Sequence, residues 1–286
     1  MFKTLAPHAI GVSAPDLPSA LRAAKIGGFK GLEMWGPSIA DLVDQHGAPA
    51  VRKMFDDGGI IPAGWGLPVD WRTTDENWKR DLGSLPRIAK AASSIGATRC
   101  FTWVLPCSDE RPLVENYTFH VERFAPVAQT LAEYGCRLGL EFIGPKTLRD
   151  SKKHPFIHTM GDMLQLAQDI GRNVGLLLDG WHWYTSGGTL PEIRALRAEQ
   201  VVYVHVNDAP TGIDVDQQID SIRCLPGETG VIDIAGFLKA LQAIGYDGPV
   251  TPEPFKKELK DLPNDEARLK LVGEAMDNIF RQAGLA

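Results

Sequence analysis

The chain has 286 residues, of which 44% are hydrophobic and 23% charged, and its formal net charge is −6. The apolar content predicts a large buried core, and an acidic balance without a basic tract argues against nucleic acid as a partner, because phosphate binding needs clustered Lys and Arg. The apolar runs are too short to span a bilayer and the four cysteines form no CxxC pair, so we expect a cytoplasmic protein with reduced thiols and no membrane partner.

Eight apolar runs of strand length recur along the chain, and helical patterns lie between them. The predicted strands are residues 8–13, 31–35, 60–66, 98–105, 137–143, 174–180, 201–208 and 249–255. The predicted helices include residues 17–28, 82–96, 124–135, 163–171, 234–245 and 265–283. Strands that alternate with helices require a parallel sheet, and eight such units can close into a barrel.

A doubly wound open sheet is the competing α/β fold. That fold usually carries a glycine-rich phosphate loop, and neither GxGxxG nor GxxxxGK[ST] follows the first predicted strand. No change of composition and no long linker marks a second domain. We therefore predict a single (β/α)8 TIM barrel domain over residues 1–286.

Polar residues stand where the last four predicted strands end, which is the edge that carries the active site in such barrels. In chain order these residues are Glu141, Asp179, His205 and Glu253. Three carboxylates that converge on one imidazole would repel one another, and a divalent cation would remove that repulsion. Oxygen and nitrogen ligands of this kind suit Mn²⁺, Co²⁺, Mg²⁺ or Zn²⁺.

Each of these four residues also has an ordinary structural interpretation. Glu141 could pair with Lys146, and Asp179 could cap the turn that follows it. His205 could be a hydrogen-bonded core histidine, and Glu253 could simply be solvated. Four such residues on four consecutive strands nevertheless favour one shared metal site over four unrelated structural roles.

Five segments carry a resemblance to a known family: "LEF", "LLLDGWHW", "VHVNDAP", "LPGETGVIDI" and "TPEPF", in this order along the last four strand–helix units. Together they resemble the sugar phosphate isomerase/epimerase family of the xylose-isomerase-like barrel superfamily. Residues 205–234 look most similar to its inosose isomerase and ketose 3-epimerase branches. In the N-terminal half the resemblance rests on the barrel pattern and on "GLEMWG".

The resemblance implies a role for each motif residue. Glu141, Asp179, His205 and Glu253 would bind one divalent metal ion, most often manganese or cobalt. His182 would bind a substrate oxygen, and Arg223 would orient the substrate or the second glutamate.

The function implied is that of a metal-dependent isomerase or epimerase acting on a small keto-sugar or keto-polyol. Glu141 and Glu253 would remove and return a proton through an enediolate that the metal stabilises. Trp35, Trp103 and Trp181 are expected to form an apolar wall for the sugar, with ordinary packing as the alternative. No cluster of Lys or Arg predicts a phosphate group on the substrate, and a homo-oligomer is compatible with the exposed barrel helices.

Three alternatives stay open at this point. The same site would serve a metal-dependent lyase or dehydratase acting on an inosose, a dehydroshikimate or a 3-keto-glycoside. "HVND" also resembles apurinic endonucleases, but those enzymes need histidines where this chain has "GWGL" and "TWVL". A barrel that has lost catalysis and only binds a ligand is disfavoured, because all four ligand types are present.

Overall fold

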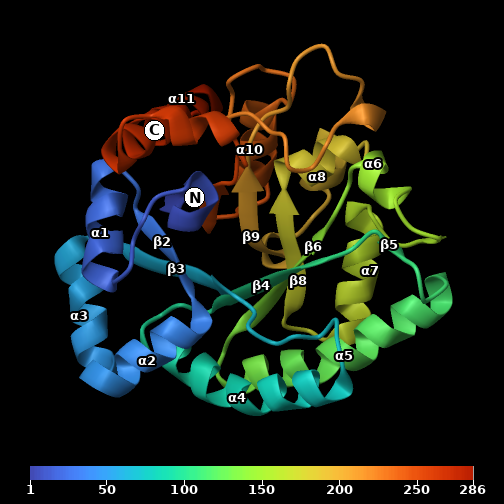
Figure 1. Ribbon diagram of the computed structural model, residues 1–286, viewed down its shortest axis with the longest axis horizontal. Helices are drawn as coiled ribbons and strands as arrows, with labels where there is room; N and C mark the ends of the chain where they lie inside the picture. The colour runs from blue at the N-terminus through green and yellow to red at the C-terminus, as the bar shows by residue number, and fades with distance from the viewer. Residues whose placement is uncertain (286) are drawn as a thin grey trace.

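The computed structural model describes residues 1–285, and a closed barrel of parallel strands forms its centre (Figure 1). Around the barrel the strands follow the order β1, β2, β3, β4, β6, β8, β9, β10, and β10 pairs with β1 to close it. Their bounds are β1 Phe2–Leu5, β2 Gly31–Trp35, β3 Ile61–Gly66, β4 Arg99–Val104, β6 Arg137–Phe142, β8 Val174–Asp179, β9 Val201–Val206 and β10 Pro249–Pro252. The predicted (β/α)8 barrel is confirmed.

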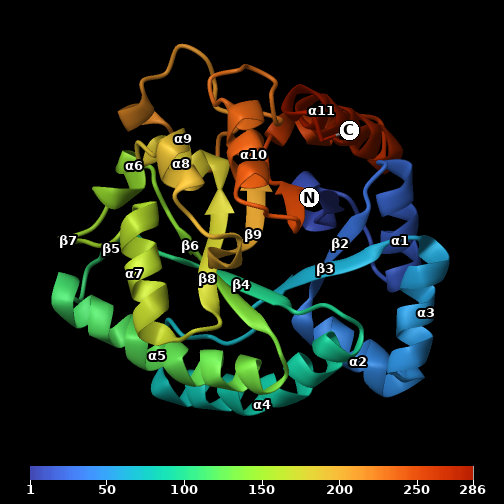
Figure 2. The same ribbon diagram turned by 180° about the vertical axis from the view of Figure 1, so that it is seen from behind.

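The helices lie around these strands, as the front and rear views both show (Figures 1 and 2). Their bounds are α1 Leu17–Ile26, α2 Gly36–His46, α3 Ala48–Gly58, α4 Asp75–Ser94, α5 Leu113–Glu133, α6 Lys146–Arg149, α7 Met160–Ile170, α8 Gly180–Thr185, α9 Leu190–Arg194, α10 Ile234–Ala243 and α11 Asp265–Ala283. A separate antiparallel pair is formed by β5 (Cys107–Ser108) and β7 (His154–Pro155). Within residues 1–285, none of the helices has the length and apolar character needed to cross a membrane.

The first predicted strand is wrong, whereas the other seven lie within three residues of the observed bounds. Residues 8–13 do not pair in the barrel, and their place is taken by β1 at Phe2–Leu5. Pro7 instead opens a short 3-10 helix, Pro7–Ile10, because its ring presets a helical φ and it has no N–H to give to a sheet. Gly11, with φ of +69°, then ends that helix.

Side chains in the barrel interior form a small cluster that we call the floor cluster: Phe101, Leu177 and Tyr203. Phe101 lies on β4 and Tyr203 on β9, two strands that are not neighbours, so their rings meet across the interior at 4.5 Å. Tyr203 and His205 are two residues apart on β9 and therefore point to the same side of the strand. The floor cluster thus supports His205 from within the barrel.

Gly64 on β3 gives the ring of Tyr203 the space that it occupies. A Cβ at this position would lie 2.7 Å from Cε2 of Tyr203 and 2.9 Å from the backbone oxygen of Arg99. Both distances are well inside van der Waals contact, and the backbone oxygen belongs to a paired strand that cannot move freely.

We predict that Gly64→Ala lowers the free energy of unfolding by about 1–3 kcal/mol, because the added methyl group overpacks the barrel interior. Urea denaturation measures the change. Gly83→Ala is the matched control, since Gly83 lies in α4 with no atom within 4 Å of a new Cβ. That control should gain about 0.5–1 kcal/mol. A Gly64→Ala variant as stable as the wild type would contradict the proposed position of the Tyr203 ring.

Candidate metal centre

The carboxyl ends of four consecutive barrel strands carry the four predicted metal ligands. Glu141 is the penultimate residue of β6, Asp179 is the last residue of β8, His205 is the penultimate residue of β9, and Glu253 follows β10 directly. One ligand atom from each residue lies within 4.8 Å of all the others. The structure therefore brings together all four residues, while metal binding by them stays a prediction.

Strand register explains why these side chains converge. His205 on β9 stands beside Asp179 on β8 and beside Thr251 on β10. Pro252 ends β10, yet the backbone N–H of Glu253 still donates to the carbonyl oxygen of Val206 at 3.0 Å. Glu253 is therefore held at the barrel mouth although its strand has already ended.

Several polar atoms at the centre of this group lack hydrogen-bond partners among the residues described. Both ring nitrogens of His205 and Oε1 of Glu141 are buried and unpartnered. His205 Nδ1 lies 3.5 Å from Glu141 Oε1 and 3.5 Å from Glu253 Oε2. A buried polar group without a hydrogen bond lowers the stability of the fold by about 1–3 kcal/mol. A bound cation would satisfy these atoms, so this set of oxygen and nitrogen donors fits a metal site.

The charges of the cluster perturb its members in opposite directions. Burial raises the pKa of Glu141, and the neighbouring Glu253 carboxylate raises it further. Burial also opposes ionisation of Glu253, but the charges of His205 and Arg223 outweigh it and lower the pKa of Glu253. The negative charge of the cluster therefore exceeds the positive charge that His205 and Arg223 supply. A divalent ion would neutralise this excess.

Asp179 is fully buried, and both of its carboxylate oxygens accept hydrogen bonds. Its Oδ1 accepts the backbone N–H of Trp181 at 2.7 Å, so it caps α8, and it also accepts from Asn207 Nδ2 at 3.1 Å. Its Oδ2 accepts from Arg223 Nη1 at 2.9 Å. The capping role anticipated for Asp179 is confirmed and coexists with its place in the cluster.

The anticipated pair between Glu141 and Lys146 does not form. Lys146 lies outside the mouth and binds Asp216 at 2.9 Å instead. Glu141 therefore keeps its position among the candidate ligands without a lysine partner.

His182 lies buried on α8, and a hydrogen bond from the backbone of Gly144 indicates its tautomer. Nδ1 accepts the backbone N–H of Gly144 at 3.2 Å, so the neutral ring carries its proton on Nε2. Burial lowers the pKa of His182 to about 3, which keeps the ring neutral. Nε2 lies 3.9 Å from Asp179 Oδ2, beside the cluster. Nε2 also lies 3.4 Å from Arg223 Nη2, which can only donate, so a ring protonated on Nε2 makes no hydrogen bond to Arg223. The Nε2–H group is then a donor at the edge of the candidate site.

Gly144 permits this arrangement, because a Cβ there would lie 2.3 Å from the backbone oxygen of His182. Only a residue without a side chain can bring its N–H so close to α8.

Arg223 binds the carboxylates of the site. Nη1 donates to Asp179 at 2.9 Å and to Glu253 Oε2 at 3.2 Å, and Nη2 donates to Asp220 at 2.7 Å. Burial opposes its charge, but these carboxylates raise the pKa of Arg223 above its ordinary value. Of the two roles expected for Arg223, its contacts match the orientation of the second glutamate.

The three tryptophans expected to form a wall are placed differently from one another. Trp35 and Trp103, at the ends of β2 and β4, keep 54% and 39% of their surface exposed. Trp181 is fully buried, because α8 folds back against the barrel and packs its ring 5.3 Å from the Arg223 guanidinium. For Trp181 this burial matches the packing alternative, and its place in an apolar wall for the substrate stays a prediction.

Three further residues of the site had no predicted role. Asn207 donates to Asp179, Asp220 binds Arg223, and Glu33 on β2 lies 3.9 Å from His205 Nε2. Asn207 directly follows β9, which is a usable signal, whereas Glu33 lies in the middle of β2. Asp220 lies in a loop, where the sequence offers no comparable signal.

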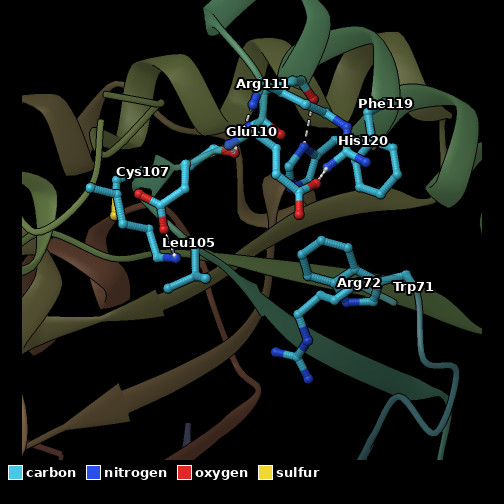
Figure 3. A pocket seen from close by; sticks show the side chains of 12 residues that line it. Trp71, Arg72, Leu105, Cys107, Glu110, Arg111, Phe119 and His120 are labelled. Atoms are coloured by element: carbon cyan, nitrogen blue, oxygen red, sulfur yellow. Dashed lines mark hydrogen bonds and ion pairs between the residues drawn. The ribbon is translucent and has the colours of Figure 1, made fainter. Parts of the chain in front are cut away.

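Beside the mouth, a partly open cavity of about 190 Å³ is lined by the loops that follow β3 and β4, by α5 and by Lys152 (Figure 3). Arg72 lines this cavity and also stacks on Trp103, with its guanidinium 4.1 Å from the ring centre. His120, from α5, lies in the cavity wall with its Nδ1 2.6 Å from the Asn116 carbonyl oxygen. Burial lowers the pKa of His120 from 6.5 to about 4.

Comparisons relate the chain to known proteins. A family profile described as xylose isomerase-like TIM barrel matches residues 21–280. An inosose isomerase of Halalkalibacterium halodurans is 30% identical over 238 residues, which cover 80% of this chain and 79% of that protein. A 3-dehydroshikimate dehydratase of Pseudomonas aeruginosa is 28% identical over 249 residues, which cover 86% of this chain and 37% of that protein. The solved structure of a xylose isomerase domain protein from Alicyclobacillus acidocaldarius matches with a TM-score of 0.85 at 31% identity, over 99% of both chains.

We predict that His120 makes the free energy of unfolding depend on pH between about 6.5 and about 4. The folded state keeps His120 neutral in this range while the unfolded chain binds a proton, so stability falls by roughly 3 kcal/mol as the pH decreases. Urea denaturation across this range, compared between wild type and His120→Gln, measures the slope that His120 contributes. His46→Gln, at an exposed position on α2, is the control. Equal slopes in wild type and His120→Gln would contradict this assignment.

Proposed function

The chain belongs to the xylose isomerase-like TIM barrel family, and we propose that it is a divalent-metal-dependent isomerase or epimerase of a small keto-sugar or keto-polyol. The observation that carries the proposal is the convergence of Glu141, Asp179, His205 and Glu253 within 4.8 Å. Its relatives are themselves enzymes, one of them an inosose isomerase, which supports an enzymatic function and a small-molecule substrate.

In this proposal Glu141 and Glu253 move the proton. Both carboxylates lie 3.5 Å from His205 Nδ1 although they come from different strands, so a substrate bound at this position would lie within reach of both. His205 and Arg223 keep Glu253 ionised, whereas burial raises the pKa of Glu141, so we assign removal of the proton next to the carbonyl to Glu253. Glu141, whose protonated form is favoured by burial, then donates its own proton, to the same carbon in an epimerisation or to the adjacent carbon in an isomerisation. Proton exchange with solvent afterwards removes the proton from Glu253 and restores the one on Glu141.

The metal ion is proposed to be Mn²⁺ or Co²⁺, with Mg²⁺ and Zn²⁺ as alternatives for the same oxygen and nitrogen donors. When bound, it would stabilise the negative charge that develops on the substrate oxygen. Asp179 and His205 would hold it, together with the two glutamates.

The remaining groups are proposed to position the substrate. His182 would donate its Nε2–H to a substrate oxygen, since its Nδ1 is already occupied by Gly144. The exposed rings of Trp35 and Trp103 would cover the C–H face of the sugar. We further propose that residues 1–286 form one domain and that the enzyme is cytoplasmic, where its four free cysteines would stay reduced.

A lyase or dehydratase is the second candidate function. The similarity to a 3-dehydroshikimate dehydratase favours it, although the chain spans only 37% of that protein. Proton removal by the same glutamate would be followed by loss of a β-hydroxyl group, so the two functions share their first step. Mass analysis of the product separates them, because an isomer keeps the mass of the substrate and a dehydration product does not.

We predict that, with added Mn²⁺, the wild type exchanges solvent deuterium at the carbon next to the carbonyl of at least one keto-sugar or inosose. Glu253→Gln should lose this exchange by about 10²–10⁴-fold, because the amide cannot accept the proton. NMR of a panel of substrates measures the exchange. Glu258→Gln, the same change at a nearby exposed position, should exchange like the wild type. Full exchange by Glu253→Gln would contradict the proton-transfer role.

A further inference from the structure

We propose that Glu33 is a positioning residue for His205, and that it accepts the N–H of the imidazole nitrogen that faces away from the other candidate ligands. This inference rests on the proposed metal site. It gives the N-terminal half of the barrel, which supplies none of the four candidate ligands, a role in the metal site.

The imidazole of His205 has two differently placed nitrogens. Nδ1 lies 3.5 Å from oxygens of both Glu141 and Glu253, so Nδ1 is the nitrogen that faces the candidate metal position. Nε2 lies 3.9 Å from Glu33 Oε2. A neutral imidazole that binds a metal through Nδ1 carries its proton on Nε2, and that N–H needs an acceptor.

Glu33 is the carboxylate placed to accept that proton. Nε2 of His205 has no hydrogen-bond partner anywhere in residues 1–285, and the Glu33 side chain is only 8% exposed. A separation of 3.9 Å is too long for a hydrogen bond, but a small side-chain rotation or one bridging water closes it. Metal-binding histidines commonly donate their second N–H to a carboxylate in this way.

A second contact holds Glu33 in place. Tyr203 donates its hydroxyl proton to Glu33 Oε2 at 3.2 Å, and the same hydroxyl oxygen accepts from Thr251 Oγ1 at 3.0 Å. Tyr203 belongs to the floor cluster, and its ring packs edge-on against His205 with the ring centres 5.6 Å apart. One tyrosine therefore contacts both the imidazole and the carboxylate that would bind it.

The backbone of the first strands aims Glu33 into the barrel. The pairing of β2 with β3 shifts register between Leu32 and Glu33, so that Glu33 stands opposite Gly64. Irregularities of this kind re-aim a side chain. Gly64 is also the residue that leaves room for the Tyr203 ring.

Two other roles for Glu33 are less well supported. It is no candidate ligand, because it faces Nε2 while the metal position lies on the Nδ1 side. Its other neighbour, His8, lies 4.0 Å away with 75% of its side chain exposed, and an exposed pair of this kind contributes little. A direct contact with substrate is the alternative that experiment must separate.

The test is metal binding without substrate. Chelator-treated wild type, Glu33→Gln and Tyr203→Phe are titrated with Mn²⁺, and the visible absorption spectrum of bound Co²⁺ is recorded for each. Glu33→Gln should raise the Mn²⁺ dissociation constant by about 10–100-fold and shift the Co²⁺ bands. Tyr203→Phe should weaken binding by a smaller factor, because Glu33 remains but is held less firmly. Glu266→Gln, on the exposed face of α11, is the control and should bind as the wild type does.

The outcomes are separable. An unchanged Mn²⁺ dissociation constant and an unchanged Co²⁺ spectrum in Glu33→Gln would overturn the inference and leave direct contact with substrate as the role of Glu33. Wild-type protein that binds neither ion would overturn the proposed function as well. Thermal unfolding of the chelator-treated proteins checks that the variants fold. If Glu33→Gln does not fold, unchanged binding in Tyr203→Phe overturns the inference.

Discussion

The mutual repulsion of carboxylates buried at the barrel mouth is the constraint on which the rest of this structure depends. Glu141, Asp179 and Glu253 surround His205 with ligand atoms within 4.8 Å of one another, where little water screens their charges. Arg223 neutralises part of this charge by binding Asp179 and Glu253. Glu141 and His205 receive no hydrogen bond from Arg223, and both keep buried polar atoms without a hydrogen-bond partner among the described residues. The carboxylate charge that Arg223 does not neutralise and these unsatisfied polar atoms together explain why a cation site is the function that the geometry supports best.

The barrel supplies what such a site needs in order to be rigid. Tyr203 and its floor cluster fill the space beneath His205, and Gly64 admits the ring that makes this packing close. Gly144 has a similar task above the cluster, where it lets a backbone N–H reach His182. Both glycines therefore matter through close approach between elements distant in the chain. Such contacts fix ligand side chains within the narrow tolerance that metal chemistry requires.

Residues whose role follows from one strand end are predictable from the sequence, and residues whose role follows from contact across the barrel are not. Parallel strands must present their last residues at one edge, so the sequence alone suffices to group Glu141, Asp179, His205 and Glu253. The first strand is misplaced because the apolar run after Pro7 favours a strand, whereas the proline itself favours a helical turn. The burial of Trp181 and the approach of Glu33 to His205 depend on how α8 folds back and how β2 is registered. Neither feature has a periodicity that a sequence could show.

A single divalent ion held by the four convergent side chains is the central claim. A crystal of the protein grown with Mn²⁺ and measured at the manganese absorption edge tests it most directly. The claim predicts one anomalous peak per chain within bonding distance of Glu141, Asp179, His205 Nδ1 and Glu253. A map with no peak there, or with its only peak elsewhere on the molecule, would contradict it.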